Sequence, residues 1–304
     1  MNGVLVSGLI RSGTTWVGRV LATAENTIYI HEPFNPDSEW NACFPLPSHM
    51  MHITSEYGGI YEGPFSKILK LEPLFRGNWR NQVSESVYSY IDKETNGIKK
   101  NVIPIIKDPV ALFSIEWLVN THYLKPVIVL RHPIGIVKSQ IRLGWIKGNK
   151  LVGIARQRSL VETFYNQQDQ RLLHENMANW SNIGTADQMC LFVRFMYLSI
   201  IYYIKKYPEW LYICYEDISN NPEQLLDVMD RTGLKQSEDT HQRLGSNKIA
   251  SYDPDKAHQN VLEAIPYDKQ RLFEADQYSD DWEYLYHKHF SDITQVVSRY
   301  VSWD

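Results

Sequence analysis

The chain has 304 residues, of which 43% are hydrophobic and 22% are charged, and its formal net charge is −4 at pH 7. This composition is typical of a folded globular protein, and the slight acidic excess gives no indication of a nucleic-acid partner. The apolar runs are shorter than the ~20 residues that a membrane-spanning helix requires. The first predicted strand begins at Val4, which leaves no room before it for a signal peptide, and we therefore expect a cytoplasmic protein.

A phosphate-binding turn is predicted close to the N-terminus. Val4 to Gly8 form a short apolar strand pattern, a turn rich in Gly, Ser and Arg follows, and Thr14 begins a helical pattern that continues to about Ala24. The N–H groups of such a turn, with the positive end of the helix dipole behind them, bind anions. The sequence therefore predicts a phosphorylated ligand.

The turn differs from the P-loop of nucleotide hydrolases in one residue type. That consensus places Lys six residues after its first Gly, where it reaches the β- and γ-phosphates. Here Thr14 occupies the position, and Arg11 is the only cation in the turn. The turn is thus poorly equipped for a triphosphate with magnesium, but it suits one compact phosphate group.

The second strand is expected at Thr27–Ile30 and runs into His31, Glu32 and Pro33. Residues 33–63 are rich in Pro, Gly, His and Asn, contain several aromatic residues and show no clear periodicity. A long stretch of this kind predicts a functional loop, which we expect to cover the substrate. Helical patterns follow at about 64–76 and 81–95.

Three further apolar strands alternate with helices. Near-continuous apolar strands with helices between them indicate a parallel sheet that is buried on both faces. We therefore predict one α/β domain over residues 1–304, with a doubly wound, mainly parallel sheet of about five strands, and we leave residues 234–304 unassigned. The later strands are expected at 102–107, 127–130 and 210–215, and helices at 110–120, 135–143, 188–206 and 222–232.

Polar side chains follow each predicted strand. Ligands in sheets of this kind bind beyond the carboxyl ends of the strands, so these side chains should line one site. They are Arg11 after the first strand, Glu32 after the second, Lys107 after the third, Arg131 after the fourth, and Tyr215 with Glu216 after the fifth.

Two of these segments resemble motifs of the sulfotransferases that use 3′-phosphoadenosine 5′-phosphosulfate (PAPS). Arg11–Trp16 resembles the loop that binds the 5′-phosphosulfate in that family. Val127–Ser139 is similar to the family's 3′-phosphate motif, a strand ending in Arg131 with Ser139 eight residues later on the next helix. The resemblance covers residues 3–235 through scattered motifs. It implies transfer of a sulfuryl group from PAPS to a hydroxyl, with 3′-phosphoadenosine 5′-phosphate as the product and no metal.

The resemblance also implies a set of nucleotide-binding residues. Arg11 would balance the charge that develops on the bridging oxygen, and Arg131 with Ser139 would hold the 3′-phosphate. A Tyr-Glu-Asp run follows a late strand in many sulfotransferases, so Tyr215 is expected to pack near the adenine. The residues expected to hold the 5′-phosphosulfate are Arg11, Ser12, Gly13, Thr14 and Thr15.

Glu32 is the expected catalytic base. In the branches of the family that modify sugars or peptides, a carboxylate just past the second strand has this role, and a carboxylate beside bound anions should have a raised pKa. The phenol and steroid branch uses a His instead, so His31 and His132 remain alternatives. Lys107 is expected either to face the sulfuryl group as a second cation or to pair with Asp108 or another acid.

The acceptor is expected to be a sugar or glycolipid. The phenol and steroid branch carries a C-terminal Arg-Lys-Gly segment, which this sequence lacks; Lys248, in Ser246–Lys248, is a candidate replacement. Two other functions stay open: a P-loop kinase for a small metabolite, and a non-catalytic relative that keeps the nucleotide site. The scattered Cys43, Cys190 and Cys214 predict free thiols, and the histidines form no convincing metal site.

Overall fold

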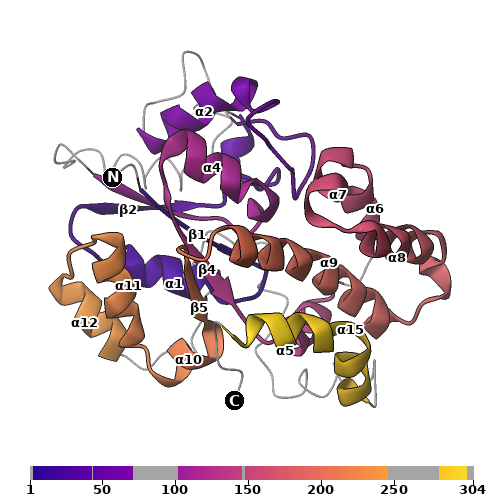
Figure 1. The fold of residues 1–304 in the computed structure, drawn as a ribbon. Helices are drawn as coiled ribbons and strands as arrows, with labels where there is room; N and C mark the ends of the chain where they lie inside the picture. Colours follow the sequence, from indigo (N-terminus) through magenta and orange to yellow (C-terminus); the bar gives the residue numbers. More distant parts are fainter. Residues whose placement is uncertain (1–2, 43, 71–101, 146–147, 246–280, 300–304) are drawn as a thin grey trace. The chain divides into compact units, whose positions relative to one another are not determined.

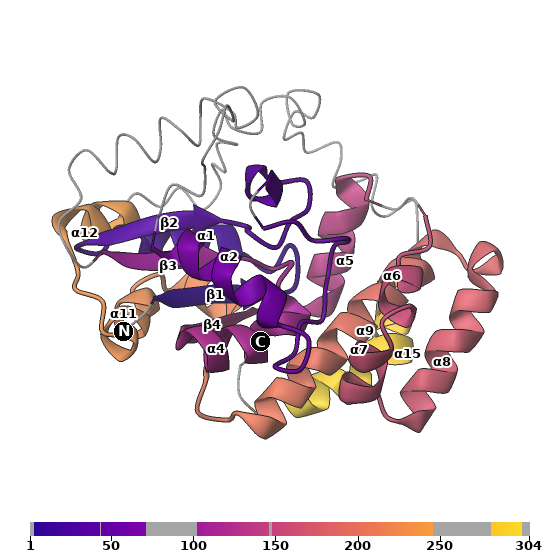
Figure 2. The ribbon, with the colours of Figure 1, turned by 90° about the horizontal axis from the view of Figure 1, so that it is seen from above.

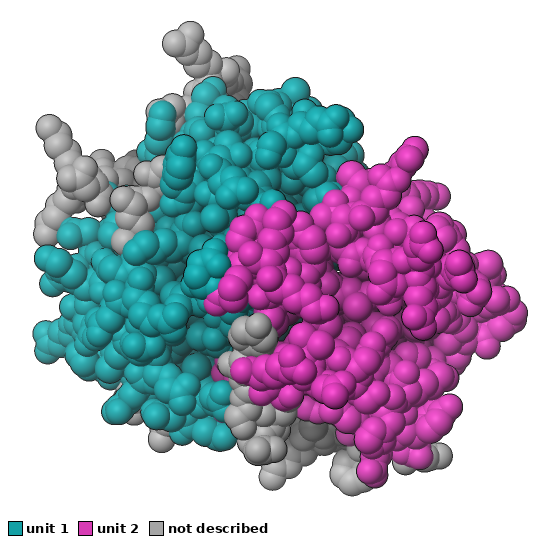
Figure 3. All heavy atoms as spheres, viewed as in Figure 1, with its two compact units in different colours: residues 1–129, 209–213, 217–247 teal, residues 130–208, 214–216, 248–304 magenta. Residues whose placement is uncertain are grey.

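A computed structural model describes residues 3–42, 44–70, 102–145, 148–245 and 281–299 (Figure 1). The helix expected at 81–95, Lys248 and Cys43 lie outside these residues. The chain divides into two compact units, coloured in Figure 3. Unit 1 comprises residues 1–129, 209–213 and 217–247, and unit 2 comprises residues 130–208, 214–216 and 248–304. The single domain expected over 1–304 stays a prediction.

Unit 1 is built on a five-stranded sheet with the strand order β2-β3-β1-β4-β5. Strand β1 pairs in parallel with β3 and β4, and β2 pairs in parallel with β3. All five predicted strands are present, which confirms the parallel α/β class. The strands span Val4–Gly8 (β1), Thr27–His31 (β2), Ile103–Lys107 (β3), Lys125–Leu130 (β4) and Leu211–Cys214 (β5).

Helices cover both faces of this sheet (Figure 1). Strand β1 is buried along its whole length and β4 is buried at five of its six residues, as expected for a sheet covered on both sides. On one face lie α1 (Thr14–Leu21), α11 (Gln224–Thr232) and α12 (Glu238–Gly245), and on the other lie α2 (Gly59–Leu69) and α4 (Ile115–His122), the latter preceded by the 3-10 turn η3 (Leu112–Ser114).

The segment between β2 and α2 has one short 3-10 turn, η1 (Glu39–Ala42), and is otherwise irregular. It is nevertheless fixed at both ends. The N–H of Phe34 donates to Asp108 Oδ2 at 2.6 Å, and the N–H of Ile53 donates to Ser114 Oγ at 2.9 Å. The rings of Phe34 and Trp117 also pack edge to face, with centroids 6.4 Å apart. Residues 33–58 therefore form a fixed wall beside the sheet; that this wall covers a substrate stays a prediction.

Unit 2 is helical. Helices α5 (Pro133–Arg142) and α9 (Thr185–Lys206) pack against α15 (Trp282–Val297), which lies alongside α9 (Figure 2). Arg194 of α9 makes a bidentate ion pair with Asp292 of α15, in which the two guanidinium NH₂ nitrogens lie 2.7 and 2.8 Å from the two carboxylate oxygens. The other helices among the described residues of unit 2 are α6 (Leu151–Ala155), α7 (Arg158–Phe164), α8 (Gln167–Ala178) and the 3-10 turn η4 (Trp180–Asn182), and α10 (Tyr215–Asn220) begins in it.

Helix α15 lies in the C-terminal region that the sequence left unassigned. Its first residue follows the cap of Asp281, whose carboxylate accepts the N–H of Tyr284 at 2.7 Å. Among the helices that the structure describes, none combines the length and the apolar character needed to cross a membrane.

Candidate functional site

The turn between β1 and α1 has the backbone shape of an anion site. Gly8 has φ 146° and Gly13, at the start of α1, has φ 99°, which are conformations that L side chains rarely adopt. A Cβ on Gly8 would lie 2.3 Å from the carbonyl oxygen of Val129 on the neighbouring strand. Glycine is therefore required at this position, and the turn leads directly into the N-terminus of α1, a backbone arrangement that can bind an anion.

Ser12 provides a side-chain donor inside this turn. Ser12 is 0% exposed, and its hydroxyl has no hydrogen-bond partner among the residues that the structure describes. A buried hydroxyl without a partner costs about 1–3 kcal/mol. An oxygen of a bound phosphate or phosphosulfate would satisfy it, so the turn fits the anion that the sequence predicts. Thr14 is also buried, whereas Arg11, Gly13 and Thr15 are partly exposed.

Glu32 and Lys107 meet at the carboxyl ends of β2 and β3. His31 is the β2 partner of Lys107, and the N–H of Glu32 donates to the Lys107 carbonyl oxygen at 2.8 Å. The backbone of Glu32 then turns with φ 44°, an uncommon value for a residue other than glycine. Its carboxylate Oε1 contacts Nζ of Lys107, whose side chain is 3% exposed. Lys107 thus pairs with an acid, one of its two predicted interpretations.

The pKa of Glu32 reflects this pairing. Burial of the carboxyl group favours its neutral form, but the charge of Lys107, followed by that of His31, outweighs burial and lowers the pKa to about 2. Asn35 contributes to the lowering by donating to Oε2 at 2.9 Å. The sequence did not reveal that a buried ammonium group contacts this carboxylate. The raised pKa expected for Glu32 beside bound anions stays a prediction. His31, the alternative base, has its Nε2 3.9 Å from Glu32 Oε1.

Gly18 of α1 makes room for the Lys107 side chain. A Cβ on Gly18 would lie 3.0 Å from Cβ and 3.2 Å from Cγ of Lys107. The aliphatic stem of Lys107 therefore passes directly against the helix backbone before its ammonium group reaches Glu32. Periodicity alone gave no reason to single out this glycine.

Asp108 is a buried carboxyl that the sequence analysis treated only as a possible partner of Lys107. Its Oδ1 accepts the N–H groups of Val110 and Ala111 at 2.9 and 3.1 Å, and its Oδ2 accepts that of Phe34. Burial, followed by the charge of Glu32, raises the pKa of Asp108 to about 7, against the effect of the Phe34 and Ala111 N–H groups and of Lys107. Asp108 thus links the segment that follows Glu32, through Phe34, to the turn that follows β3, through Val110 and Ala111.

In unit 2, Arg131 is held at the start of α5. Its backbone N–H donates to the hydroxyl of Tyr197 at 3.3 Å, and the same hydroxyl donates to the Arg131 carbonyl oxygen. The guanidinium carbon lies 4.4 Å from the centre of the Tyr215 ring, a cation–π contact. A Cβ on Gly135 would lie 3.3 Å from Arg131 Nε, so the guanidinium runs close to the first turn of the helix. Ser139, one turn further on, is 7% exposed.

His132, the second alternative base, contacts Glu216 through its backbone and Tyr286 through its ring. Its backbone N–H donates to Glu216 Oε1 at 3.1 Å, and its ring stacks on the Tyr286 ring, with the ring centroids 5.3 Å apart. Burial lowers its pKa, although Glu216 opposes this. The stacking favours a structural role for the His132 ring.

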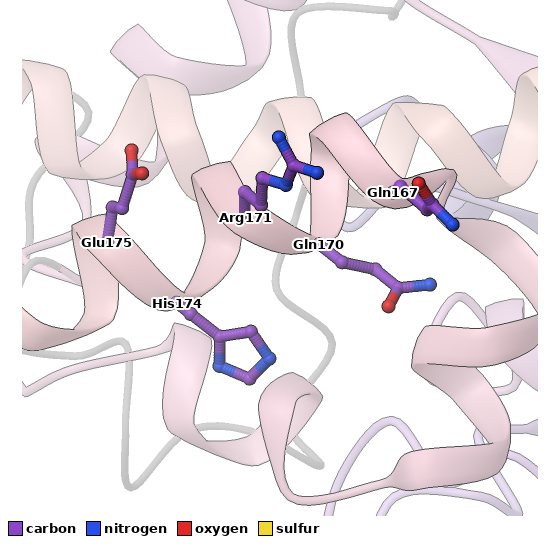
Figure 4. Close-up of a pocket in the computed structure, with 5 residues that line it drawn as sticks. All are labelled: Gln167, Gln170, Arg171, His174 and Glu175. Carbon is purple, nitrogen blue, oxygen red and sulfur yellow. The ribbon is translucent and has the colours of Figure 1, made fainter.

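A surface hollow of about 480 Å³ in unit 2 is a different kind of feature (Figure 4). Its lining residues all come from α8, so no second element brings chemistry to it: Gln167, Gln170, Arg171, His174 and Glu175. We assign it no function. Nor do His, Cys, Asp and Glu side chains of the described residues gather into a cluster that could hold a metal ion.

Comparisons with known proteins give one structural similarity. No family model and no curated protein sequence matches the chain. Among solved structures, the chain is similar to one described as "Sulfotransferase Domain from the Curacin Biosynthetic Pathway", with 15% sequence identity and a TM-score of 0.43. The similarity covers 90% of this chain and 96% of that one. At this level of similarity, the reaction of this chain has to be argued from its own residues.

Proposed function

We propose that this chain is a sulfotransferase that moves a sulfuryl group from PAPS to a hydroxyl acceptor. One observation carries the proposal. An anion-binding turn with the buried Ser12 hydroxyl and without a P-loop lysine follows β1, and the Glu32–Lys107 pair follows β2 and β3 of the same parallel sheet. A donor for one anionic group, a cation and a carboxylate are the parts that sulfuryl transfer to a hydroxyl needs.

The nucleotide would be held by the groups that the sequence analysis named. Arg11 and the turn from Ser12 to Thr15 would bind the 5′-phosphosulfate. Arg131 and Ser139 would bind the 3′-phosphate, with Tyr215 keeping the guanidinium in place and packing near the adenine. A planar guanidinium suits this task because it offers two parallel donors to a phosphate.

Glu32 would accept the proton, and Lys107 would determine how basic Glu32 is. A carboxylate with a pKa of about 2 is ionised at neutral pH but accepts a proton weakly. The anionic oxygens of a bound sulfuryl group would compete for the Lys107 ammonium, and Glu32 would then become more basic because burial favours its neutral form. As the acceptor oxygen bonds to sulfur and the bond from sulfur to the bridging phosphate oxygen breaks, the hydroxyl proton passes to Glu32.

The acceptor that we propose is a sugar or a glycolipid. The missing Arg-Lys-Gly segment and the position of the carboxylate after β2 support this class over phenols and steroids. Of the aromatic residues in the wall formed by residues 33–58, Phe34 and Phe44 are buried in the core, whereas Tyr57 is 61% exposed. The exposed ring of Tyr57 is therefore the one that we propose stacks on a sugar ring.

Nucleotide binding tests the proposal first. In calorimetric titrations of the whole chain, we expect 3′-phosphoadenosine 5′-phosphate to bind and ATP with magnesium to bind far more weakly, because Thr14 replaces the P-loop lysine. Transfer of radiolabelled sulfuryl from PAPS to a panel of sugars and glycolipids would then identify the acceptor. Preference for ATP with magnesium would favour a kinase, and binding without transfer to any hydroxyl would favour a non-catalytic relative.

Gly135→Ala should weaken nucleotide binding without loosening the helix. The added methyl group would press on Arg131 Nε, whereas alanine favours helix over glycine by about 1 kcal/mol. We expect affinity for 3′-phosphoadenosine 5′-phosphate to fall about three- to tenfold, part of the ~1.5–3 kcal/mol of a hydrogen bond to a charged group. Gly153→Ala in α6 is the matched control, since a Cβ there meets nothing within 4 Å. Equal affinities in the two variants would contradict the 3′-phosphate role of Arg131.

A further inference from the structure

Asn35 contacts the carboxylate that the proposed reaction depends on. Its Nδ2 donates to Oε2 of Glu32 at 2.9 Å, while Lys107 occupies Oε1. Each carboxylate oxygen therefore has its own donor. The oxygen beside the neutral amide is the more basic of the two, because an ammonium group stabilises negative charge more strongly than an amide does.

The orientation of the Asn35 amide follows from a second hydrogen bond. The N–H of Asp37 donates to Asn35 Oδ1 at 3.1 Å, which identifies that atom as the oxygen. The other end of the amide must then be the NH₂ group, and this is the end that faces Glu32. The backbone adds a further link, because the Asn35 N–H donates to the Glu32 carbonyl oxygen at 3.1 Å. Three residues after the turn at Glu32, the chain thus folds back onto its side chain.

We infer that Asn35 is a positioning residue for Glu32, because its amide group directs the proton-accepting oxygen Oε2. This inference rests on the proposed function, in which Glu32 is the base. It adds a residue from the wall formed by residues 33–58, and so gives part of that wall a function in catalysis. Asn35 is partly exposed.

The other charges around Glu32 are known and do not replace Asn35. Lys107 and Asp108 face it from the end of β3, and His31 faces it from β2. Arg19 of α1 also acts on Lys107. These groups set the charge of the site, but Asn35 is the group that donates to Oε2 among the described residues.

Asn35→Asp tests the inference. The new carboxylate can still accept the Asp37 N–H, so the turn keeps its hydrogen bond, but it presents an oxygen in place of the NH₂ group that faces Glu32. Two adjacent carboxyl groups release their protons in two coupled steps. We expect the acid dissociation constant of the second step to be at least about tenfold smaller than that of Glu32 in the natural chain. The measurement is a pH titration of the ¹³C-labelled carboxyl carbons by NMR on the whole chain. The Glu32 signal is identified as the one that is missing from the spectrum of Glu32→Gln.

The pH dependence of turnover gives the second readout. While the introduced carboxyl group is protonated it can still donate to Oε2, whereas once it is ionised it repels that oxygen. At pH values below the second pKa of the carboxyl pair, turnover of Asn35→Asp should therefore be close to that of the natural chain, and above that pKa it should fall at least about tenfold. Affinity for 3′-phosphoadenosine 5′-phosphate should stay within about twofold at every pH. A purely structural role would lower turnover equally at every pH.

Asn41→Asp is the matched control. Asn41 belongs to the same irregular segment, is also partly exposed, and accepts the N–H of Leu46 through Oδ1 at 3.2 Å. It should leave both the Glu32 titration and the pH profile unchanged. An unaltered Glu32 titration in Asn35→Asp would overturn the inference. Failure of the proposed function would look different: the natural chain would then bind no 3′-phosphoadenosine 5′-phosphate, while the titration would still report on the Asn35 contact.

Discussion

Glu32→Gln should reduce sulfuryl transfer by about a hundredfold or more while leaving nucleotide binding intact. General base catalysis contributes about 10²- to 10⁴-fold, and the amide cannot take the acceptor proton. Gln keeps the size of the side chain, and its oxygen can still accept from the Lys107 ammonium, so the anion-binding turn should be undisturbed. The measurement is the rate of transfer from radiolabelled PAPS to the best acceptor of the panel, beside calorimetry with 3′-phosphoadenosine 5′-phosphate.

Glu62→Gln provides the control for this substitution. Glu62 is an exposed carboxylate in the first turn of α2, in the same unit, and it should show unchanged transfer and unchanged binding. Full activity of Glu32→Gln would move the base elsewhere, first to His31, whose Nε2 lies near the same carboxylate. Loss of nucleotide binding together with activity would mean that Glu32 holds the turn rather than the proton.

The strands of this fold were predictable because each one is a short, mainly apolar run between segments with turn or helix patterns. Val4–Gly8 and Val127–Leu130 are buried on both faces, so composition alone marks them, and the structure places their ends within two residues of the prediction. Helix α2 begins at Gly59 rather than near residue 64, and Pro64 lies inside it. Helix α15 was not predicted, since its ion pairs with α9 come from residues about 100 positions away, such as Arg194 and Asp292.

The candidate site was predictable only at the level of strand ends. Parallel strands bring Glu32 and Lys107 to the same edge of the sheet, and this follows from the strand pattern alone. Which side chains pair there depends on the positive φ of Glu32 and on the space beside Gly18. The anchoring role of Asp108 and the contact of Asn35 with Glu32 were missed for a related reason: both depend on hydrogen bonds made by a segment without periodicity. An Asn or Asp two residues before a backbone N–H that it can accept is the local signal that would have marked them.

Lys107→Met should destabilise the protein strongly at neutral pH and much less in acid. Met fills the space of the aliphatic stem beside Gly18, so the main change is a buried carboxylate without its cation, which costs about 3–5 kcal/mol. In the natural chain the pKa of Glu32 lies at about 2, below its ordinary 4.5, so its contribution to stability is complete above pH 4.5 and is lost as the pH falls toward 2. In the variant, burial should raise that pKa above 4.5, so stability should instead fall as the pH rises.

The two pH dependences can be separated by urea unfolding of both proteins at pH 4 and pH 7. The difference in the free energy of unfolding should be largest at pH 7 and should shrink by more than half at pH 4, where Glu32 of the variant can take up a proton. Asp108 adds to this trend, because Lys107 also lowers its pKa. Lys67→Met, at an exposed lysine of α2, should change stability by less than about 0.5 kcal/mol at either pH. A pH-independent loss in Lys107→Met would mean that packing of the stem, not the charge on Glu32, is what Lys107 contributes to the fold.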